Sequence, residues 1–267
     1  MFGPTTRAVP EAGVFRHFTI VVKWPSMIEK KTFVRYWNRR FSLALVPIAL
    51  IAAVLPTTIR AFDAQPSKIS GASIWQVTPQ FLKDAHSACD KIRGSNYSSC
   101  FIDQMEKTGA PAAAVAFTRE LYKFNHGDVG MMGGFQPVGP VDIAWVNYPL
   151  RANTNYGLLL VNGEPRIIDV ENLKLLDEKN MKQSAQFNDL KGQFPNVNLW
   201  PGDRDGKTWP NSQTGPNGGI QFIADYPLRN GCHACASAGL AFFNWNFDAK
   251  GKFLGTTFVG MTPPPLQ

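Results

Sequence analysis

The sequence predicts an α+β protein in which a disulfide-stapled N-terminal helical hairpin packs on a mostly antiparallel β-sheet. Apolar residues recur at helical spacing in residues 75–125, and apolar and polar residues alternate at strand spacing in residues 140–260. The four cysteines stand in two close pairs. Helices followed by runs of strands are typical of α+β domains, and 267 residues suffice for one good-sized core or two small ones.

Residues 1–64 are expected to form a leader, and residues 65–267 a single exported domain. An apolar run, Phe41 to Leu55, follows three arginines and precedes small residues, which is the layout of a secretory signal peptide. This run of 15 residues is shorter than the roughly 20 apolar residues of a membrane span. The pattern therefore favours a cleaved signal over an uncleaved anchor.

The sequence offers two starts for the leader. Residues 1–26 precede the positive region, and a start at Met27 would give a signal peptide, residues 27–64, of ordinary length. Residues 1–26 are therefore interpreted as a possible mis-called start. The expected location is the periplasm or the extracellular space, with membrane contact only through the leader if it stays uncleaved.

The net charge of +7 is concentrated in the leader. Nine of the 27 basic residues and three of the 20 acidic residues precede Gln65, which leaves 18 basic and 17 acidic residues beyond it. The exported part therefore has a net charge of about +1. Because nucleic-acid binding depends on basic surfaces that neutralise phosphates, no nucleic-acid partner is predicted.

All four cysteines lie beyond the leader, and an even number in an exported chain indicates two disulfides. We predict local pairing, Cys89 with Cys100 and Cys232 with Cys235. Cross-pairing, which would tie the helical half to the C-terminal strands, is the alternative. On the chain-entropy model, the short loop closed by the first pair contributes roughly 3 kcal/mol.

Helices are expected throughout the first part of the domain. Thr78 is a suitable N-cap and Pro79 a suitable first residue. A polar loop, residues 95–99, is expected before the second helix, and glycines stop the first two helices. The predicted helices are 78–94, 100–109 and 111–122.

The sequence of the second part of the domain predicts mainly strands. Residues 126–140 are rich in Gly and Pro and predict a turn-rich connector, with glycine spacing that fits no phosphate-binding loop. Asn162-Gly163 between two apolar runs predicts a hairpin. One helix, 175–192, and a polar loop, 201–219, interrupt the pattern. The predicted strands are 141–146, 156–161, 165–170, 197–200, 220–224, 241–247 and 252–259.

The tetrapeptide Tyr-Pro-Leu-Arg occurs twice, at 148–151 and 226–229. Each copy precedes an Asn-containing loop and a predicted hairpin, which suggests a two-fold strand-hairpin repeat. Guanidinium groups in equivalent places could bind a carboxylate or a sulfate. In the alternative interpretation each arginine pairs with a local acid or with carbonyl groups. The candidate binding residues are Tyr148, Arg151, Tyr226 and Arg229.

The Cys-His-Ala-Cys segment allows a redox site. Cys232 would be the nucleophile, His233 would stabilise its thiolate, and Cys235 would resolve the mixed disulfide. However, a thioredoxin-type pair precedes a long helix, and the residues after Cys235 alternate like a strand. A structural disulfide is therefore favoured. Covalent haem attachment is excluded because Ala236 stands where a histidine is needed, and neither a metal site nor a cofactor is predicted.

Catalytic motifs are absent from the sequence. It contains no Gly-x-Ser-x-Gly, His-Glu-x-x-His or Ser-x-x-Lys. The expected function is therefore that of an exported binding or interaction protein, whose partner is an unknown protein, a glycan or a small anionic ligand. A thiol-disulfide oxidoreductase using Cys232 and Cys235, and a hydrolase with an unrecognised site, are the alternatives.

Overall fold

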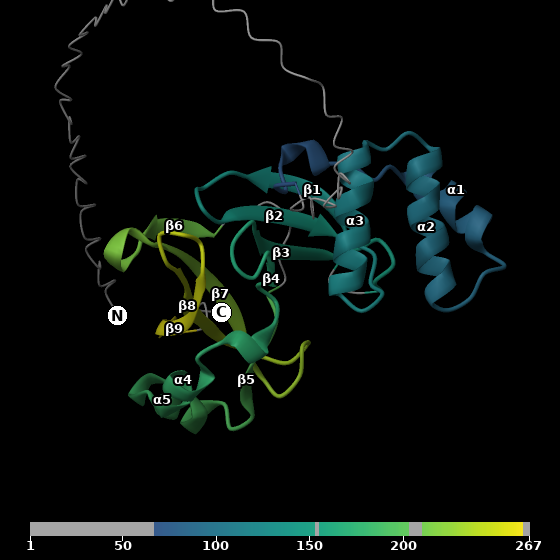
Figure 1. Cartoon of the computed structure of the whole chain (residues 1–267). Helices are drawn as coiled ribbons and strands as arrows, with labels where there is room; N and C mark the ends of the chain where they lie inside the picture. The colour runs from purple at the N-terminus through teal and green to yellow at the C-terminus, as the bar shows by residue number, and fades with distance from the viewer. Residues whose placement is uncertain (1–66, 153–154, 203–209, 264–267) are drawn as a thin grey trace, which may run out of the picture. The chain divides into compact units, whose positions relative to one another are not determined.

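The computed structural model describes residues 67–152, 155–202 and 210–263, so the leader and its start lie outside the described residues. All described residues belong to one compact unit. Within them the chain forms helices and two antiparallel sheets, which confirms the α+β class (Figure 1). The prediction of a single sheet is wrong, because the strands divide into two sets that share a core.

The N-terminal part is helical. Its elements are η1 (Gly71–Ser73), α1 (Pro79–Cys89), α2 (Ser95–Lys107) and α3 (Ala112–Phe124). The Thr78 hydroxyl accepts a hydrogen bond from the Phe81 N–H, 3.1 Å away, and so caps α1 as predicted. The predicted polar loop at 95–99 is wrong. Gly94 has a φ of 65°, and this left-handed residue turns the chain sharply enough for α2 to begin directly after it.

The first sheet has the strand order β1-β2-β3-β4. Its strands are β1 (Met131–Gln136), β2 (Asp142–Asn147), β3 (Tyr156–Val161) and β4 (Ile167–Asp169). Both faces of β2 and β3 are buried: Ile143 and Leu160 contribute to the core shared with the second sheet, whereas Ala144 and Leu159 contribute to the core under α3. Burial on both faces explains why these strands read as nearly unbroken apolar runs.

The glycine-rich segment before β2 is an edge strand, not the predicted turn-rich connector. A side chain at either of two of its glycines would crowd neighbouring side chains. A Cβ on Gly130 would come within 2.7 Å of Leu121, Val146 and Tyr148, and one on Gly133 would lie 2.8 Å from the Asn147 amide. The glycines therefore permit close approach to neighbouring elements, and β1 pairs with β2 through a bulge.

The second sheet has the order β5-β7-β8-β9, and β6 also pairs with β7. Its strands are β5 (Val197–Leu199), β6 (Asn211–Thr214), β7 (Ile220–Asn230), β8 (Ser237–Phe247) and β9 (Phe253–Thr262). The predicted polar loop 201–219 is therefore wrong at β6. Its four residues are all exposed and polar, so they lack the apolar alternation by which a strand is recognised.

The two sheets pack face to face around one core. Alternate residues of β7 and β8, including Tyr226 and Trp245, point into it and are buried. The Tyr226 hydroxyl donates to the Val170 carbonyl at 2.8 Å and accepts from Trp245 Nε1 at 3.0 Å. Residues on the opposite, outer face of β7 and β8 are half-buried, which is typical of an antiparallel sheet with one face toward solvent.

The predicted helix 175–192 is broken into η2 (Leu173–Leu175), α4 (Glu178–Gln183) and α5 (Ala185–Gln193). Short polar side chains cause the breaks. Asp177 caps α4, and Ser184, whose ψ of 147° is extended, accepts from the Phe187 N–H at 3.1 Å. Asp and Ser side chains compete with helical hydrogen bonds and so favour caps over helix interiors.

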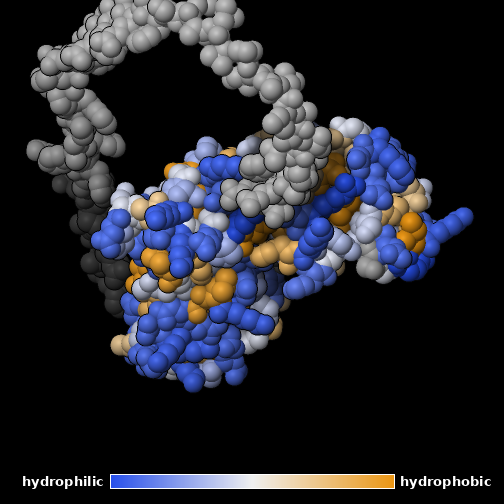
Figure 2. All heavy atoms as spheres, viewed as in Figure 1, coloured by the Kyte–Doolittle hydropathy of each residue, from blue (hydrophilic) through white to orange (hydrophobic). Residues whose placement is uncertain are grey.

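Hydrophilic residues cover most of the surface seen in Figure 2, with hydrophobic residues in separate patches. Leu254 and Val259 are the most exposed large hydrophobic side chains among the described residues. Both stand where the β8–β9 register skips a residue, so both are bulge residues of the edge strand β9. No helix in the described ranges is long and apolar enough to cross a membrane.

Candidate functional site

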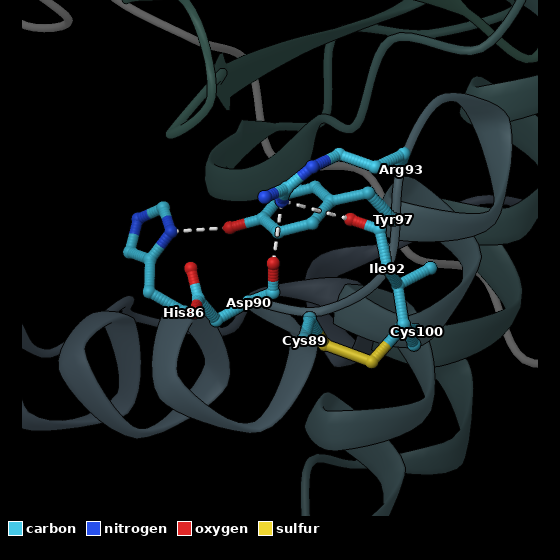
Figure 3. Close-up of a disulfide and its surroundings, with 7 residues drawn as sticks. All are labelled: His86, Cys89, Asp90, Ile92, Arg93, Tyr97 and Cys100. Atoms are coloured by element: carbon cyan, nitrogen blue, oxygen red, sulfur yellow. Dashed lines mark hydrogen bonds between the residues drawn. A yellow bond between two sulfur atoms is a disulfide. The ribbon is translucent and has the colours of Figure 1, made fainter.

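Both predicted cysteine pairings are confirmed. The surroundings of the first disulfide indicate that it stabilises the fold. Cys89–Cys100 joins the end of α1 to α2, and Cys89 is completely buried. Beside it the His86 ring is hydrogen-bonded to the Tyr97 hydroxyl, and Arg93 donates to the Asp90 carbonyl (Figure 3). Burial, and then the charge of Asp90, raise the pKa of Tyr97. These polar groups therefore satisfy one another.

The second disulfide, unlike the first, lies at an exposed position. Cys232–Cys235 closes a turn at the tip of the β7–β8 hairpin, where Cys232 and His233 are exposed. The Cys235 N–H donates to the Cys232 carbonyl at 3.0 Å, and Gly231 begins the turn with a φ of 101°. A strand, β8, follows the pair, as the alternation predicted. The pair therefore lacks the helix N-terminus that lowers the pKa of thioredoxin-type thiols.

Arg229, Trp200 and His233 gather beside this hairpin. Asn198 lies opposite Arg229 in the β5–β7 register. The backbone N–H of Trp200 donates to the Pro227 carbonyl at 2.9 Å. Strand alternation therefore places the side chains of Trp200 and Arg229 on the outer face of the second sheet. The His233 ring packs edge-on against the Trp200 ring, with centroids 5.7 Å apart.

Two donors in this group have no acceptor among the described residues. Arg229 Nε and Trp200 Nε1 are both buried, and neither has a hydrogen-bond partner in the part of the chain that the structure describes. No described carboxylate forms an ion pair with Arg229. A buried donor left without a partner costs about 1–3 kcal/mol. A ligand could therefore supply the hydrogen-bond acceptor that these two donors lack.

A pocket adjoins the same edge of the sheet. It has a volume of about 370 Å³ and is lined by Asn198, the residue opposite Arg229, together with Lys182, Phe187 and Lys191 from α4 and α5. Lys182 is paired with Glu178, one turn away along α4. The basic side chains around β5 favour a ligand with negative charge.

In the first Tyr-Pro-Leu-Arg copy, the side chains of Tyr148 and Arg151 contact each other and other residues of the chain. Arg151 Nε lies 2.6 Å from Asp128 Oδ2, and the guanidinium carbon lies 3.5 Å from the centroid of the Tyr148 ring. Tyr148 is buried, and its hydroxyl accepts from Asn125 Nδ2 at 3.1 Å. Burial, and then the charge of Asp169, raise the pKa of Tyr148. Arg151 therefore pairs with a local acid.

The two copies also differ in backbone structure. Residues 148–151 form a turn after β2, closed by the Arg151 N–H on the Tyr148 carbonyl at 3.2 Å. Residues 226–229 instead lie inside β7, where they pair with β8. The repeat hypothesis is therefore not supported at this motif. Tyr226, which is completely buried, belongs to the core and not to an exposed binding surface.

Sequence reasoning identified Arg229, His233 and the cysteines but missed Trp200 as their neighbour. Alternation along 220–230 could have placed Arg229 on an outer face, but the β5–β7 register that brings Trp200 there is a tertiary contact. Within the described ranges, no group of three His, Cys, Asp or Glu side chains is placed to hold a metal ion.

Comparisons with protein-family models, with curated proteins and with solved structures gave no match.

Proposed function

We propose that the chain is an exported binding protein that holds an acidic group of its ligand between Arg229 and Trp200, beside the disulfide hairpin. The observation that carries the proposal is the pair of buried donors, Arg229 Nε and Trp200 Nε1, which lack acceptors among the described residues. A carboxylate has two oxygens and can accept from both donors. His233 packs on Trp200 and supports the indole ring in its place.

The strength of the interaction can be bounded. A hydrogen bond to a charged group contributes about 1.5–3 kcal/mol. Loss of the guanidinium should therefore weaken binding by about 10- to 100-fold. Arg229 Nε has no hydrogen-bond acceptor among the described residues, so replacement of Arg229 by Met should leave the fold intact.

Titration of the indole N–H resonances by NMR tests the proposal. Acetate and sulfate, added at constant ionic strength, serve as the simplest anionic probes. The Trp200 resonance should shift and saturate in the native protein, and in Arg229→Met the same shift should need about 10- to 100-fold more anion. The Trp245 resonance is an internal control, because its indole N–H already donates to Tyr226 inside the core.

Arg151→Ala is the matched control variant, because Arg151 is paired with Asp128. It should lower stability and leave the Trp200 titration unchanged. The proposal fails if Trp200 does not respond to either anion, or if Arg229→Met responds as the native protein does.

Thiol-disulfide exchange at Cys232–Cys235 is a second candidate function, favoured by the exposure of this disulfide. A substrate thiolate would attack the Cys232 sulfur, and the Cys235 thiolate would leave. A second substrate thiol would then displace Cys232, so that two electrons pass from the substrate dithiol to the protein. A pair that stays oxidised in a glutathione buffer would exclude this function.

A further inference from the structure

Resting on that proposed function, we propose that the ligand is an oligosaccharide with one acidic sugar, which lies along the outer face of the second sheet with its carboxylate at Arg229. This face consists of the alternate residues of β7 and β8 that point away from the core, together with Trp200. Its residues are half-buried and none is fully buried, so no described segment forms a further layer over the face.

The polar atoms without partners on this face are of two kinds. At the hairpin end, Arg229 Nε and Trp200 Nε1 are donors that lack acceptors within the described ranges. Further along, Asn244 Oδ1 is a buried acceptor that lacks a donor among the described residues. A simple anion can satisfy only the first kind. A ligand that satisfies both must carry acceptors and donors, as the carboxylate and hydroxyl groups of a sugar acid do.

The spacing of these atoms requires an extended ligand. Asn244 lies opposite Ile223 on β7, and Ile223 is six residues from Arg229. At the usual rise of a strand this is about 20 Å. A single sugar cannot span that distance, whereas a short chain of sugars can.

Beside Asn244, side chains form a hydrogen-bonded row across four strands. Gln213 donates to Gln221 at 3.1 Å, Gln221 donates to Asn246 at 2.7 Å, and Asn246 donates to Thr257 at 2.9 Å. The row fixes the orientation of each amide and leaves further lone pairs and N–H groups on the face. Such a fixed array of donors and acceptors suits the hydroxyl groups of a sugar chain.

Charge sets the direction of the ligand. Arg229 carries the positive charge at the hairpin end of this face, so the acidic sugar belongs there and neutral sugars belong over the remainder. The half-exposed rings of Trp200 and Phe242 offer apolar surface to the C–H faces of sugar rings.

An extended acidic peptide is the competing ligand, and the geometry disfavours it. Peptides that add to a sheet bind through the backbone groups of an edge strand. The unsatisfied atoms here belong to side chains on the face of the sheet, at Trp200, Arg229 and Asn244.

Calorimetric titration with four probes tests the inference. The probes are glucuronic acid, a linear tetrasaccharide that ends in one glucuronic acid, the matching neutral tetrasaccharide, and tetraglutamate. The acidic tetrasaccharide should bind at least about tenfold more tightly than glucuronic acid. Asn244→Ala and Gln221→Ala should each remove most of that gain and leave the affinity for glucuronic acid unchanged.

Gln76→Ala is the matched amide control, because Gln76 donates to the Gly133 carbonyl beside the first sheet. It should change no affinity. Equal binding of glucuronic acid and the acidic tetrasaccharide would overturn the inference and leave the proposed function standing. Tighter binding of tetraglutamate would replace the sugar by a peptide. If no acidic probe binds, the proposed function fails as well.

Discussion

Asp142 shows how one buried acid can organise several segments. Its carboxylate accepts hydrogen bonds from the Val138 N–H at 2.9 Å and from Asn162 Nδ2 at 2.8 Å, and it lies 3.0 Å from Lys68 Nζ. Asn162 in turn bonds to the N–H and the carbonyl of Ile69. Burial alone would raise the pKa of Asp142, but these hydrogen bonds together lower it below its usual range.

This lowered pKa predicts an acid-sensitive contribution to stability. The folded chain holds fewer protons at Asp142 than the unfolded chain does, so stability falls as pH falls. The contribution is fully present above the ordinary aspartate pKa of about 3.9 and is lost as pH drops through the lowered folded value. Asp142→Asn should cost about 1.5–3 kcal/mol at pH 7 and flatten this part of the pH dependence in urea unfolding.

Asp103→Asn is a suitable comparison for Asp142→Asn. Asp103 is an exposed acid that pairs with Arg119 on the surface, and surface pairs contribute only about 0–1 kcal/mol. Its variant should retain the acid-induced loss. If Asp142→Asn also retained the full loss, the acid sensitivity would have to arise elsewhere in the chain.

At the scale of elements, the disulfides differ in what surrounds them. Cys89–Cys100 is held between α1 and α2 with Cys89 buried, whereas Cys232–Cys235 lies at an exposed hairpin tip. Thiol-disulfide exchange requires the attacking thiolate to reach a sulfur atom. The difference in exposure therefore predicts a difference in reactivity.

Under native conditions, mild reductant should open Cys232–Cys235 first and leave Cys89–Cys100 intact. Alkylation at successive times, followed by peptide mass spectrometry, measures the two rates. In denaturant both pairs are accessible, so the rates should converge. Equal rates in the native protein would instead show that α1 and α2 separate readily.

At the scale of the whole molecule, Tyr226 connects the two sheets. Its hydroxyl lies between the Val170 carbonyl, directly after β4, and the Trp245 indole of β8. The core around it includes residues of both sheets. The sheets should therefore unfold together, in one cooperative transition.

Tyr226→Phe should lower the free energy of unfolding by about 1–3 kcal/mol, because two buried groups lose their partner. Urea unfolding followed by tryptophan fluorescence and by far-UV circular dichroism measures the loss. Tyr156→Phe is the control: Tyr156 is 44% exposed, and its variant should stay within about 0.5 kcal/mol. Separate transitions in the native protein would contradict a shared core.

Sequence patterns located most helices and strands because periodic apolar residues reflect burial on one face. The patterns failed where something other than one-sided burial determined the backbone conformation. At β1, glycines serve close packing against Asn147 and Tyr148, so the segment resembled a turn. At β6, every residue is polar, so no alternation was visible. Between 173 and 193, capping by Asp177 and Ser184 divided a pattern that resembled one helix.

At the candidate site, too, some features follow from the sequence and others only from the tertiary structure. The sequence by itself favoured the local disulfide pairing and showed that a strand and not a helix follows Cys235, because these features depend on neighbours along the chain. Only the tertiary structure decided that Arg151 pairs with Asp128, that Tyr226 is core, and that Trp200 joins Arg229. Strand register and side-chain pairing join residues far apart in sequence, and no local pattern encodes them.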